Sequence, residues 1–235
     1  MTKNNSEFVK NFIKKTKLSI SEEDISEAFV HRSFLNESKS SKLENNERLE
    51  FLGDAVLELV ATEFLFEKYP KKPEGELTAL RSALVRGKNL SQVAENLDIF
   101  GCLLLSKGES RTTGKARGLI LANTIEAIIG AIYKYSGYEE AKRFIDENIL
   151  SIIDNIIEDK LYVDAKSDFQ EKVQERDKKT PYYKVEEEEG PDHNKVFVSG
   201  VYIGKKLVAT GQGNSKSQAE QEAAISALNK EFKKA

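Results

Sequence analysis

The chain has 235 residues, of which 39% are hydrophobic and 32% are charged. This composition is typical of a folded protein with one large or two smaller domains, and it excludes a disordered chain. The formal net charge of −3 gives no support for nucleic-acid binding, because phosphate binders are often basic overall. A local basic patch is nevertheless enough to bind phosphate.

The cellular compartment is inferred from three features of the sequence. A single cysteine, Cys102, excludes an intramolecular disulfide and fits a reducing compartment. Residues 1–10 are polar and lack the apolar region of a signal peptide, and no apolar run approaches the roughly 18 residues of a membrane span. We therefore expect a cytoplasmic protein with no membrane association.

The chain up to about residue 160 has a helical pattern. Ser21 predicts a helix N-cap, with the acidic Asp24 three residues further on. Between 106 and 117, a segment rich in Gly, Ser and Thr predicts a loop without regular structure. Apolar periodicity predicts helices over 49–69, 75–85, 90–97, 119–135 and 138–157. The first of these helices is expected to stop at Pro70.

After about residue 161 the pattern changes to a helix, three strands and a helix. The strands are predicted from β-branched and aromatic residues with turn residues between them. The predicted elements cover 168–176, 182–188, 196–202, 205–211 and 215–232. The polar residues 158–160 mark the boundary, which predicts domains over 1–158 and 164–235. The expected fold class is an all-helical domain followed by an α-β-β-β-α domain.

Three acids stand at helical spacing near residue 50. Glu47, Glu50 and Asp54 fall at i, i+3 and i+7, so a helix places all three on one face. Like charges at these spacings destabilise a helix by roughly 0.2–0.5 kcal/mol per pair. A surface helix gains nothing from this clustering, whereas a site for Mg²⁺ does, because that ion prefers carboxylate oxygens. Another face carries the predicted core residues Leu49, Leu52 and Val56.

The run over 46–57, Asn-Glu-Arg-Leu-Glu-Phe-Leu-Gly-Asp-Ala-Val-Leu, resembles the signature of bacterial ribonuclease III. The resemblance covers roughly residues 5–155 and includes 28–37, 74–78 with Leu80 and Arg81, and 120–131. It implies an all-helical, homodimeric endonuclease domain that hydrolyses double-stranded RNA with a metal-activated water. The expected products carry 5′-phosphate and 3′-hydroxyl ends, and each subunit cuts one strand.

The resemblance also implies a metal site, with Mg²⁺ as the cofactor and Mn²⁺ as a substitute. Its expected ligands are Glu50, Asp54, Asn123 and Glu126, of which Asp54 and Glu126 are also the expected catalytic residues. Glu47 and Glu74 match ancillary acids. The family has aspartate where this chain has Asn123, whose amide oxygen can bind Mg²⁺ but adds no negative charge. We therefore expect weaker metal binding and slower cleavage.

Two further expectations concern the same domain. By resemblance, Phe51 inserts into a socket on the partner subunit; from its residue type alone, it is an ordinary core phenylalanine. The loop over 107–117 is expected near RNA, with Arg111, Lys115 and Arg117 contacting phosphate, or it is simply a solvated basic loop.

The second domain resembles a double-stranded-RNA-binding domain. The matching segments are 168–171, 181–183, 190–193, Phe197, 211–216 and 219–224. Such a module recognises the shape of A-form RNA across two minor grooves and the phosphates between them. The residues implied in RNA binding are Gln170 and Glu171 in one minor groove, Pro191, Asp192 and His193 in the next, and Lys216 at phosphate. The family usually has a second basic residue after this lysine, where this chain has Ser217. Gln218 is expected to add a polar contact.

The expected function is therefore an endonuclease for double-stranded RNA that processes ribosomal RNA precursors and some messenger RNAs. The alternative is a duplex-RNA-binding protein that keeps the nuclease fold but is catalytically weakened, which Asn123 favours. A helical scaffold without nucleic acid is a third reading. A Walker-type glycine loop is lacking, so no nucleotide cofactor is expected.

Overall fold

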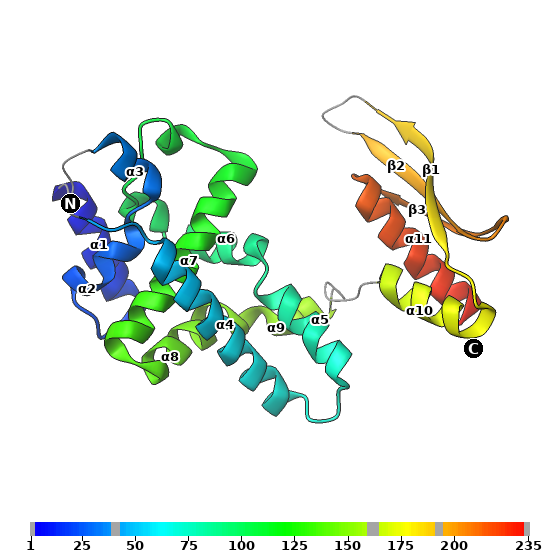
Figure 1. Cartoon of the computed structure of the whole chain (residues 1–235), viewed down its shortest axis with the longest axis horizontal. Helices are drawn as coiled ribbons and strands as arrows, with labels where there is room; N and C mark the ends of the chain where they lie inside the picture. The colour runs from blue at the N-terminus through cyan, green and yellow to red at the C-terminus, as the bar shows by residue number, and fades with distance from the viewer. Residues whose placement is uncertain (1–2, 39–42, 159–164, 191–194, 233–235) are drawn as a thin grey trace. The chain divides into compact units, whose positions relative to one another are not determined.

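The computed structural model describes residues 3–38, 43–158, 165–190 and 195–232. The chain divides into two compact units, Met1–Tyr162 and Val163–Ala235. The fold class expected from the sequence is confirmed: a helical unit precedes a unit with a three-stranded sheet and two helices (Figure 1). The finer boundaries at residues 158 and 164 stay a prediction.

The first unit consists of α-helices joined by short 3-10 turns. The helices are α1 (Lys3–Thr16), α2 (Glu22–Ser26), α3 (Arg32–Glu37), α4 (Glu47–Lys68), α5 (Glu74–Leu84), α6 (Gly87–Asn96), α7 (Gly114–Ser136), α8 (Tyr138–Asn148) and α9 (Ile153–Glu158). The 3-10 turns are η1 (Glu27–Phe29), η2 (Ile99–Cys102), η3 (Glu109–Arg111) and η4 (Leu150–Ile152). The predicted N-cap is confirmed, since the Ser21 hydroxyl accepts a hydrogen bond from the Asp24 amide.

The sequence prediction was wrong in two places in this unit. Part of the segment over 106–117 has regular structure, since η3 covers Glu109–Arg111 and α7 begins at Gly114. The Glu109 amide donates to the Ser106 hydroxyl at the beginning of η3. The helix predicted over 138–157 is interrupted after Asn148, whose side-chain amide donates to the Phe144 carbonyl. Helices α1 and α3 were missed.

The core of the first unit forms around α7, which crosses α4 in the centre of the unit (Figure 1). By length and composition alone, α7 is long and apolar enough to cross a membrane. This was not expected from the sequence, in which no uninterrupted run of apolar residues approaches the length of a membrane span. Of its most apolar window, 61% is buried inside the unit. This burial is typical of the central helix of a folded domain.

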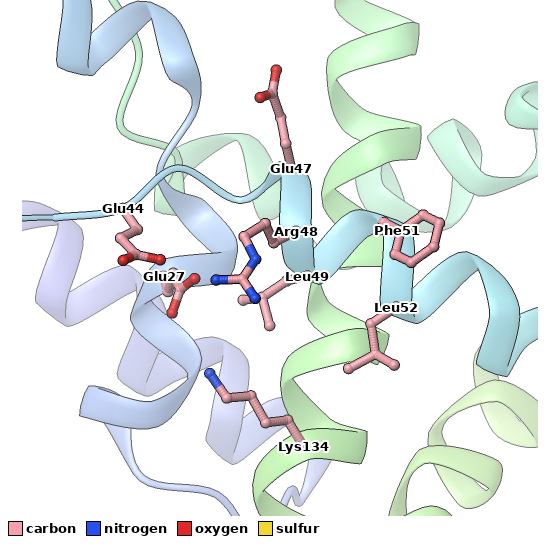
Figure 2. A pocket seen from close by; sticks show the side chains of 8 residues that line it. All are labelled: Glu27, Glu44, Glu47, Arg48, Leu49, Phe51, Leu52 and Lys134. Carbon is pink, nitrogen blue, oxygen red and sulfur yellow. The ribbon is translucent and has the colours of Figure 1, made fainter.

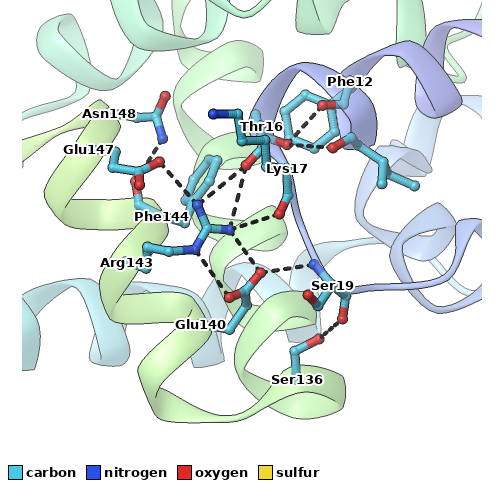
Figure 3. A network of polar contacts seen from close by, with 11 residues as sticks. Phe12, Thr16, Lys17, Ser19, Ser136, Glu140, Arg143, Phe144, Glu147 and Asn148 are labelled. Carbon is cyan, nitrogen blue, oxygen red and sulfur yellow. Dashed lines mark hydrogen bonds and ion pairs between the residues drawn. The ribbon is translucent and has the colours of Figure 1, made fainter.

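Helix α1 is attached to α8 by a network of polar contacts centred on Arg143 (Figure 3). The guanidinium donates to the carbonyl oxygens of Thr16 and Lys17, which lie at the carboxyl end of α1. It also pairs with Glu140 at 2.8 Å and with Glu147 at 3.0 Å. A cation at a helix C-terminus satisfies carbonyls that have no partner within the helix.

The second unit packs two helices against one antiparallel sheet of strand order β1-β2-β3. Its elements are α10 (Ala165–Asp177), β1 (Tyr182–Glu189), β2 (Val196–Ile203), β3 (Lys206–Gly213) and α11 (Lys216–Glu231). Gly211 lets α11 approach β3, because a Cβ on it would lie 2.1 Å from the Ala223 amide nitrogen. A small core with Phe169 and Val173 of α10 fills the interior.

Candidate active site

Two glycines allow α4 and α7 to touch through their backbones. A Cβ on Gly53 would lie 1.7 Å from the carbonyl oxygen of Glu126, and a Cβ on Gly130 would lie 2.1 Å from the carbonyl oxygen of Leu49. Only glycine permits such an approach. Since Glu50 and Asp54 flank Gly53 on α4, the contact brings both acids towards Glu126 on α7.

The charges of these side chains influence one another. We call Glu50, Asp54, Asn123 and Glu126 the α4–α7 cluster. Burial raises the pKa of Glu126 to about 7, and the negative charges of Asp54 and Glu50 add to this effect. Burial also raises the pKa of Glu50, whereas a hydrogen bond from the Asn123 amide opposes that rise. Acids from two helices therefore share one electrostatic environment.

The donor types in the α4–α7 cluster fit a hard divalent cation, since carboxylate and amide oxygens are its preferred ligands. A cation would also relieve the repulsion that raises the pKa of Glu126. Within the described residues, however, no group of three or more His, Cys, Asp or Glu side chains is already arranged to hold a metal. Metal binding therefore requires the carboxylates to turn towards a common point.

A cavity of about 410 Å³ opens beside the α4–α7 cluster. Its lining comes from α3, the start of α4 and α7, and consists of His31, Arg32, Asn46, Glu47, Glu50, Leu119, Ile120 and Asn123. Burial lowers the pKa of His31, which favours the neutral imidazole at neutral pH. Because His31 is then uncharged, Arg32 provides the positive charge among the described residues that line this cavity, which also include Glu47 and Glu50.

The two ancillary acids occupy different places. Glu47 lines this cavity, where it pairs with Arg32 at 3.4 Å and accepts a hydrogen bond from Asn45. Glu74 instead lines a separate cavity with Phe66, near the other end of α4. Glu50 and Phe66 are about 24 Å apart along the helix axis. Within one chain, Glu74 is therefore not brought to the α4–α7 cluster.

Phe51 is 82% exposed, so its reading as a core residue is wrong. Leu49 and Val56 are buried as expected, whereas Leu52 is only half-buried. Phe51 and Leu52 line a further cavity of about 560 Å³, in which Arg48 points towards acidic side chains and Lys134 enters from α7 (Figure 2).

The basic residues of the segment over 107–117 have different environments. Arg117 is half-buried, and its guanidinium stacks on the Phe100 ring at 3.8 Å from the ring centroid. This packing does not favour the expected phosphate contact. Arg111 and Lys115 are exposed and remain available to bind phosphate.

In the second unit, the residues expected to bind RNA lie on α10 and at the start of α11. Gln170 and Glu171 are exposed on α10. Lys216 pairs with Glu188 of β1 at 2.8 Å and lies over the Phe197 ring. Pro191, Asp192 and His193 lie outside the described residues.

The start of α11 also uses its polar side chains to cap the helix. The Ser215 hydroxyl accepts from the Gln218 amide nitrogen, and the Gln218 side-chain oxygen accepts from the Asn214 amide. Part of the hydrogen-bonding capacity of Gln218 is thus already in use. Ser217 is exposed beside it.

The sequence interpretation missed the parts played by Gly53, Gly130 and Arg32. The two glycines lie inside segments otherwise apolar and helical, where glycine is costly unless another backbone comes close. That cost is a usable signal. Arg32 had no comparable signal, because the sequence does not show that α3 faces the acids of α4.

Comparisons with known proteins identify the family to which each unit is similar. A family described as ribonuclease-III-like matches residues 22–153, and the double-stranded RNA binding motif matches residues 165–231. The chain is 46% identical over 208 residues to ribonuclease 3 of Syntrophomonas wolfei, covering 88% of each chain. It is 43% identical over 206 residues to ribonuclease 3 of Pelotomaculum thermopropionicum, covering 88% of this chain and 86% of the relative.

The first unit is also similar to a solved nuclease domain. The nuclease domain of ribonuclease III from Campylobacter jejuni, described with structural flexibility in a region involved in dimer formation, is 39% identical. It matches 60% of this chain and 97% of its own, with a TM-score of 0.53.

The fold and the paired helices with their acids define a nuclease joined to a module for duplex RNA. The chain belongs to the ribonuclease III family. It is accordingly an endoribonuclease for double-stranded RNA, and its family depends on divalent metal.

Proposed function

We propose that this chain cuts double-stranded RNA with Mg²⁺ bound by the α4–α7 cluster, that Mn²⁺ serves as a substitute, and that the products carry 5′-phosphate and 3′-hydroxyl ends. The observation that carries this proposal is the backbone contact of α4 with α7 at Gly53 and Gly130, which brings Glu50 and Asp54 towards Glu126; the raised pKa of Glu126 agrees with it. A divalent cation would offset the negative charge that these carboxyl groups place close together.

The bound metal would supply Lewis-acid chemistry, lowering the pKa of a water molecule and stabilising charge on the phosphate. Glu50 and Asp54 would hold it through carboxylate oxygens on successive turns of α4. Glu126, whose pKa is raised to about 7, would contribute its carboxylate from α7 once that group is deprotonated. Asn123 orients Glu50 through its amide hydrogen bond.

The test is cleavage of an end-labelled RNA hairpin, with and without Mg²⁺. We expect cleavage only with divalent metal, and we expect Glu126→Gln to reduce the rate by at least 100-fold at equal folding, because the amide cannot supply the anionic ligand. Cleavage that is unaffected by EDTA, or by Glu126→Gln, contradicts the assignment of this site.

We further propose that the second unit binds duplex RNA through Gln170 and Glu171 in one minor groove and Lys216 at phosphate, with Ser217 and Gln218 as neutral polar contacts. Pro191, Asp192 and His193 complete this surface in the proposal. The exposure of the α10 residues supports it. The pairing of Lys216 with Glu188 implies that phosphate must compete with a carboxylate.

The working form in this proposal is a homodimer, in which each subunit cuts one strand. Helix α4 carries an exposed apolar stripe formed by Phe51, Leu59 and Phe66, which are 82%, 51% and 72% exposed. A two-fold interface places the same surface on both subunits, so a protruding side chain next to a cavity is self-complementary. The cavity in Figure 2 is therefore our proposed socket for the partner's Phe51.

The cellular role that we propose is processing of ribosomal RNA precursors and some messenger RNAs in the cytoplasm. The chemistry of an enzyme that recognises duplex shape rather than sequence suits such structured transcripts. We propose residues 1–158 as the nuclease domain and 164–235 as the RNA-binding domain.

A second candidate function is duplex-RNA binding with weakened catalysis. Asn123 favours it, because its amide donates to Glu50 instead of adding a negative charge to the α4–α7 cluster. RNA binding without measurable cleavage at any Mg²⁺ concentration would support this candidate over the enzyme.

A further inference from the structure

Arg32 contributes positive charge to the wall of the cavity beside the α4–α7 cluster. It is the first residue of α3, and its positive charge is close enough to Glu50 to oppose in part the rise in pKa that burial causes in that carboxyl. Arg32 takes no part in the proposed metal chemistry. A planar guanidinium beside a site for RNA cleavage matches the geometry of phosphate oxygens.

The ion pair of Arg32 with Glu47 is loose. Arg32 Nη1 and Glu47 Oε1 are 3.4 Å apart, and the two side chains are 69% and 52% exposed. By comparison, the hydrogen-bonded ion pair of Arg143 Nη2 with Glu140 Oε1 measures 2.8 Å, a distance typical of charge-assisted hydrogen bonds. An exposed pair at the longer distance is readily exchanged for another anion.

The backbone that carries Arg32 is firmly held. The His31 amide donates to the Leu104 carbonyl, and the His31 ring caps α3 by accepting from the Ser33 amide. The Ser33 hydroxyl in turn accepts from the Ser106 amide. The start of α3 is thus held by hydrogen bonds, while the exposed side chain of Arg32 lines the cavity.

We propose that Arg32 binds a phosphate of the RNA strand being cut, and that Glu47 holds the guanidinium in place until the phosphate displaces it. This inference rests on the proposed function, since it places RNA in the cavity beside the α4–α7 cluster. Glu47 is then a positioning residue that acts through Arg32 rather than a metal ligand. Its carboxylate occupies the position that a phosphate oxygen takes in the complex.

The first test measures binding of a hairpin RNA to the full-length protein in EDTA over a range of salt concentrations. We expect Arg32→Gln to weaken binding by about 5–10-fold and to reduce the slope of log affinity against log salt by about one. Arg32→Lys keeps the charge and should keep the slope. The control Lys10→Gln removes another exposed cation with a loose carboxylate partner, Glu22, and should change neither quantity. An unchanged slope in Arg32→Gln overturns the proposal.

The second test addresses Glu47. Because Glu47 competes with phosphate for Arg32, Glu47→Gln should bind RNA about 2–3-fold more tightly, and this gain should vanish when Arg32 is already glutamine. An equal gain in both backgrounds means general repulsion and overturns the role of Glu47, as does weaker binding by Glu47→Gln.

A cleavage measurement separates this inference from the proposed function. In single-turnover reactions with Mg²⁺, Arg32→Gln should raise the half-saturating enzyme concentration by about 5–10-fold, and Arg32→Lys should restore it in part. If the parent binds RNA but never cuts it, the proposed function fails, while the slope in EDTA still decides whether Arg32 contacts phosphate.

Discussion

The Cβ that Gly53 lacks would lie 1.7 Å from the carbonyl oxygen of Glu126, so the two helices that carry the acids are in backbone contact. No side chain can fit between them at this point. The position of Glu126 relative to Glu50 and Asp54 is therefore set by the packing of α4 on α7, before any metal is bound.

Gly53→Ala should destabilise the first unit strongly, by about 3 kcal/mol or more, because neither backbone can move without disrupting the core. Urea unfolding followed by circular dichroism measures this loss. The matched control is Gly75→Ala in α5, where an added Cβ meets nothing within 4 Å and should stabilise by about 0.4–1 kcal/mol. Equal stability of Gly53→Ala and the parent would contradict the close contact.

Asn123→Asp should strengthen metal binding, because it replaces a neutral amide by a carboxylate in the α4–α7 cluster. We expect the Mg²⁺ concentration for half-maximal cleavage to fall by about 10-fold, which corresponds to about 1.4 kcal/mol. A titration of the hairpin cleavage rate with Mg²⁺ measures it. If the reversion improves neither rate nor metal affinity, Asn123 is not limiting.

The raised pKa of Glu126 predicts how stability depends on pH in the metal-free protein. The folded state holds this proton up to about pH 7, whereas the ordinary value is 4.5, so the stabilising contribution is present below 4.5 and is lost as pH rises through 7. Relative to Glu126→Gln, the parent should lose about 1–2 kcal/mol between pH 5 and pH 8, after allowance for solvent screening.

Denaturant unfolding in EDTA at both pH values measures this loss, and saturating Mg²⁺ should reduce it. A difference between parent and variant that is the same at pH 5 and pH 8 would show that Glu126 titrates normally.

Phe51→Ala should shift the protein towards monomer, because it removes the most exposed aromatic side chain of α4 and leaves the proposed socket empty. We expect the dimer dissociation constant to rise at least 10-fold, measured by sedimentation at several concentrations. Ile225→Ala, which changes an exposed apolar residue of α11, is the control. An unaltered dimer would remove Phe51 from the interface.

Lys216→Gln should weaken binding of duplex RNA by about 3–10-fold and lower the slope of log affinity against log salt by about one, since it removes the proposed phosphate contact. The neutral Ser217 beside it cannot compensate for the lost charge. Filter binding of a hairpin over a salt series tests this. Unchanged affinity and slope would show that Glu188 keeps Lys216 from phosphate in the complex.

Much of the fold could be predicted from the sequence because apolar spacing directly reflects burial. Helix α4 follows from that spacing and ends before Pro70, as expected. The three strands follow from their β-branched and aromatic residues with turn residues between them. Helix α1 was missed because its polar face dominates its composition and its docking depends on Arg143, which is distant in sequence.

The site was only partly predictable, because local spacing groups residues on one helix but does not show which distant segments come into contact. Residues on one helix, such as Glu50 and Asp54, can be grouped by periodicity. Arg117 on Phe100 and Lys216 beside Glu188 depend on tertiary contacts that no local pattern encodes. The separation of Glu74 from the α4–α7 cluster likewise depends on where α5 packs along α4.

Phe51 follows directly after Glu50, so one helix supplies both the proposed subunit contact and part of the metal site. If the homodimer is the working form, separation of the subunits would silence both centres, even though the packing of α4 on α7 keeps the acids together. The number of working centres would then depend steeply on the cellular abundance of the chain, and a modest fall in its synthesis would silence more cleavage than the loss of protein alone suggests.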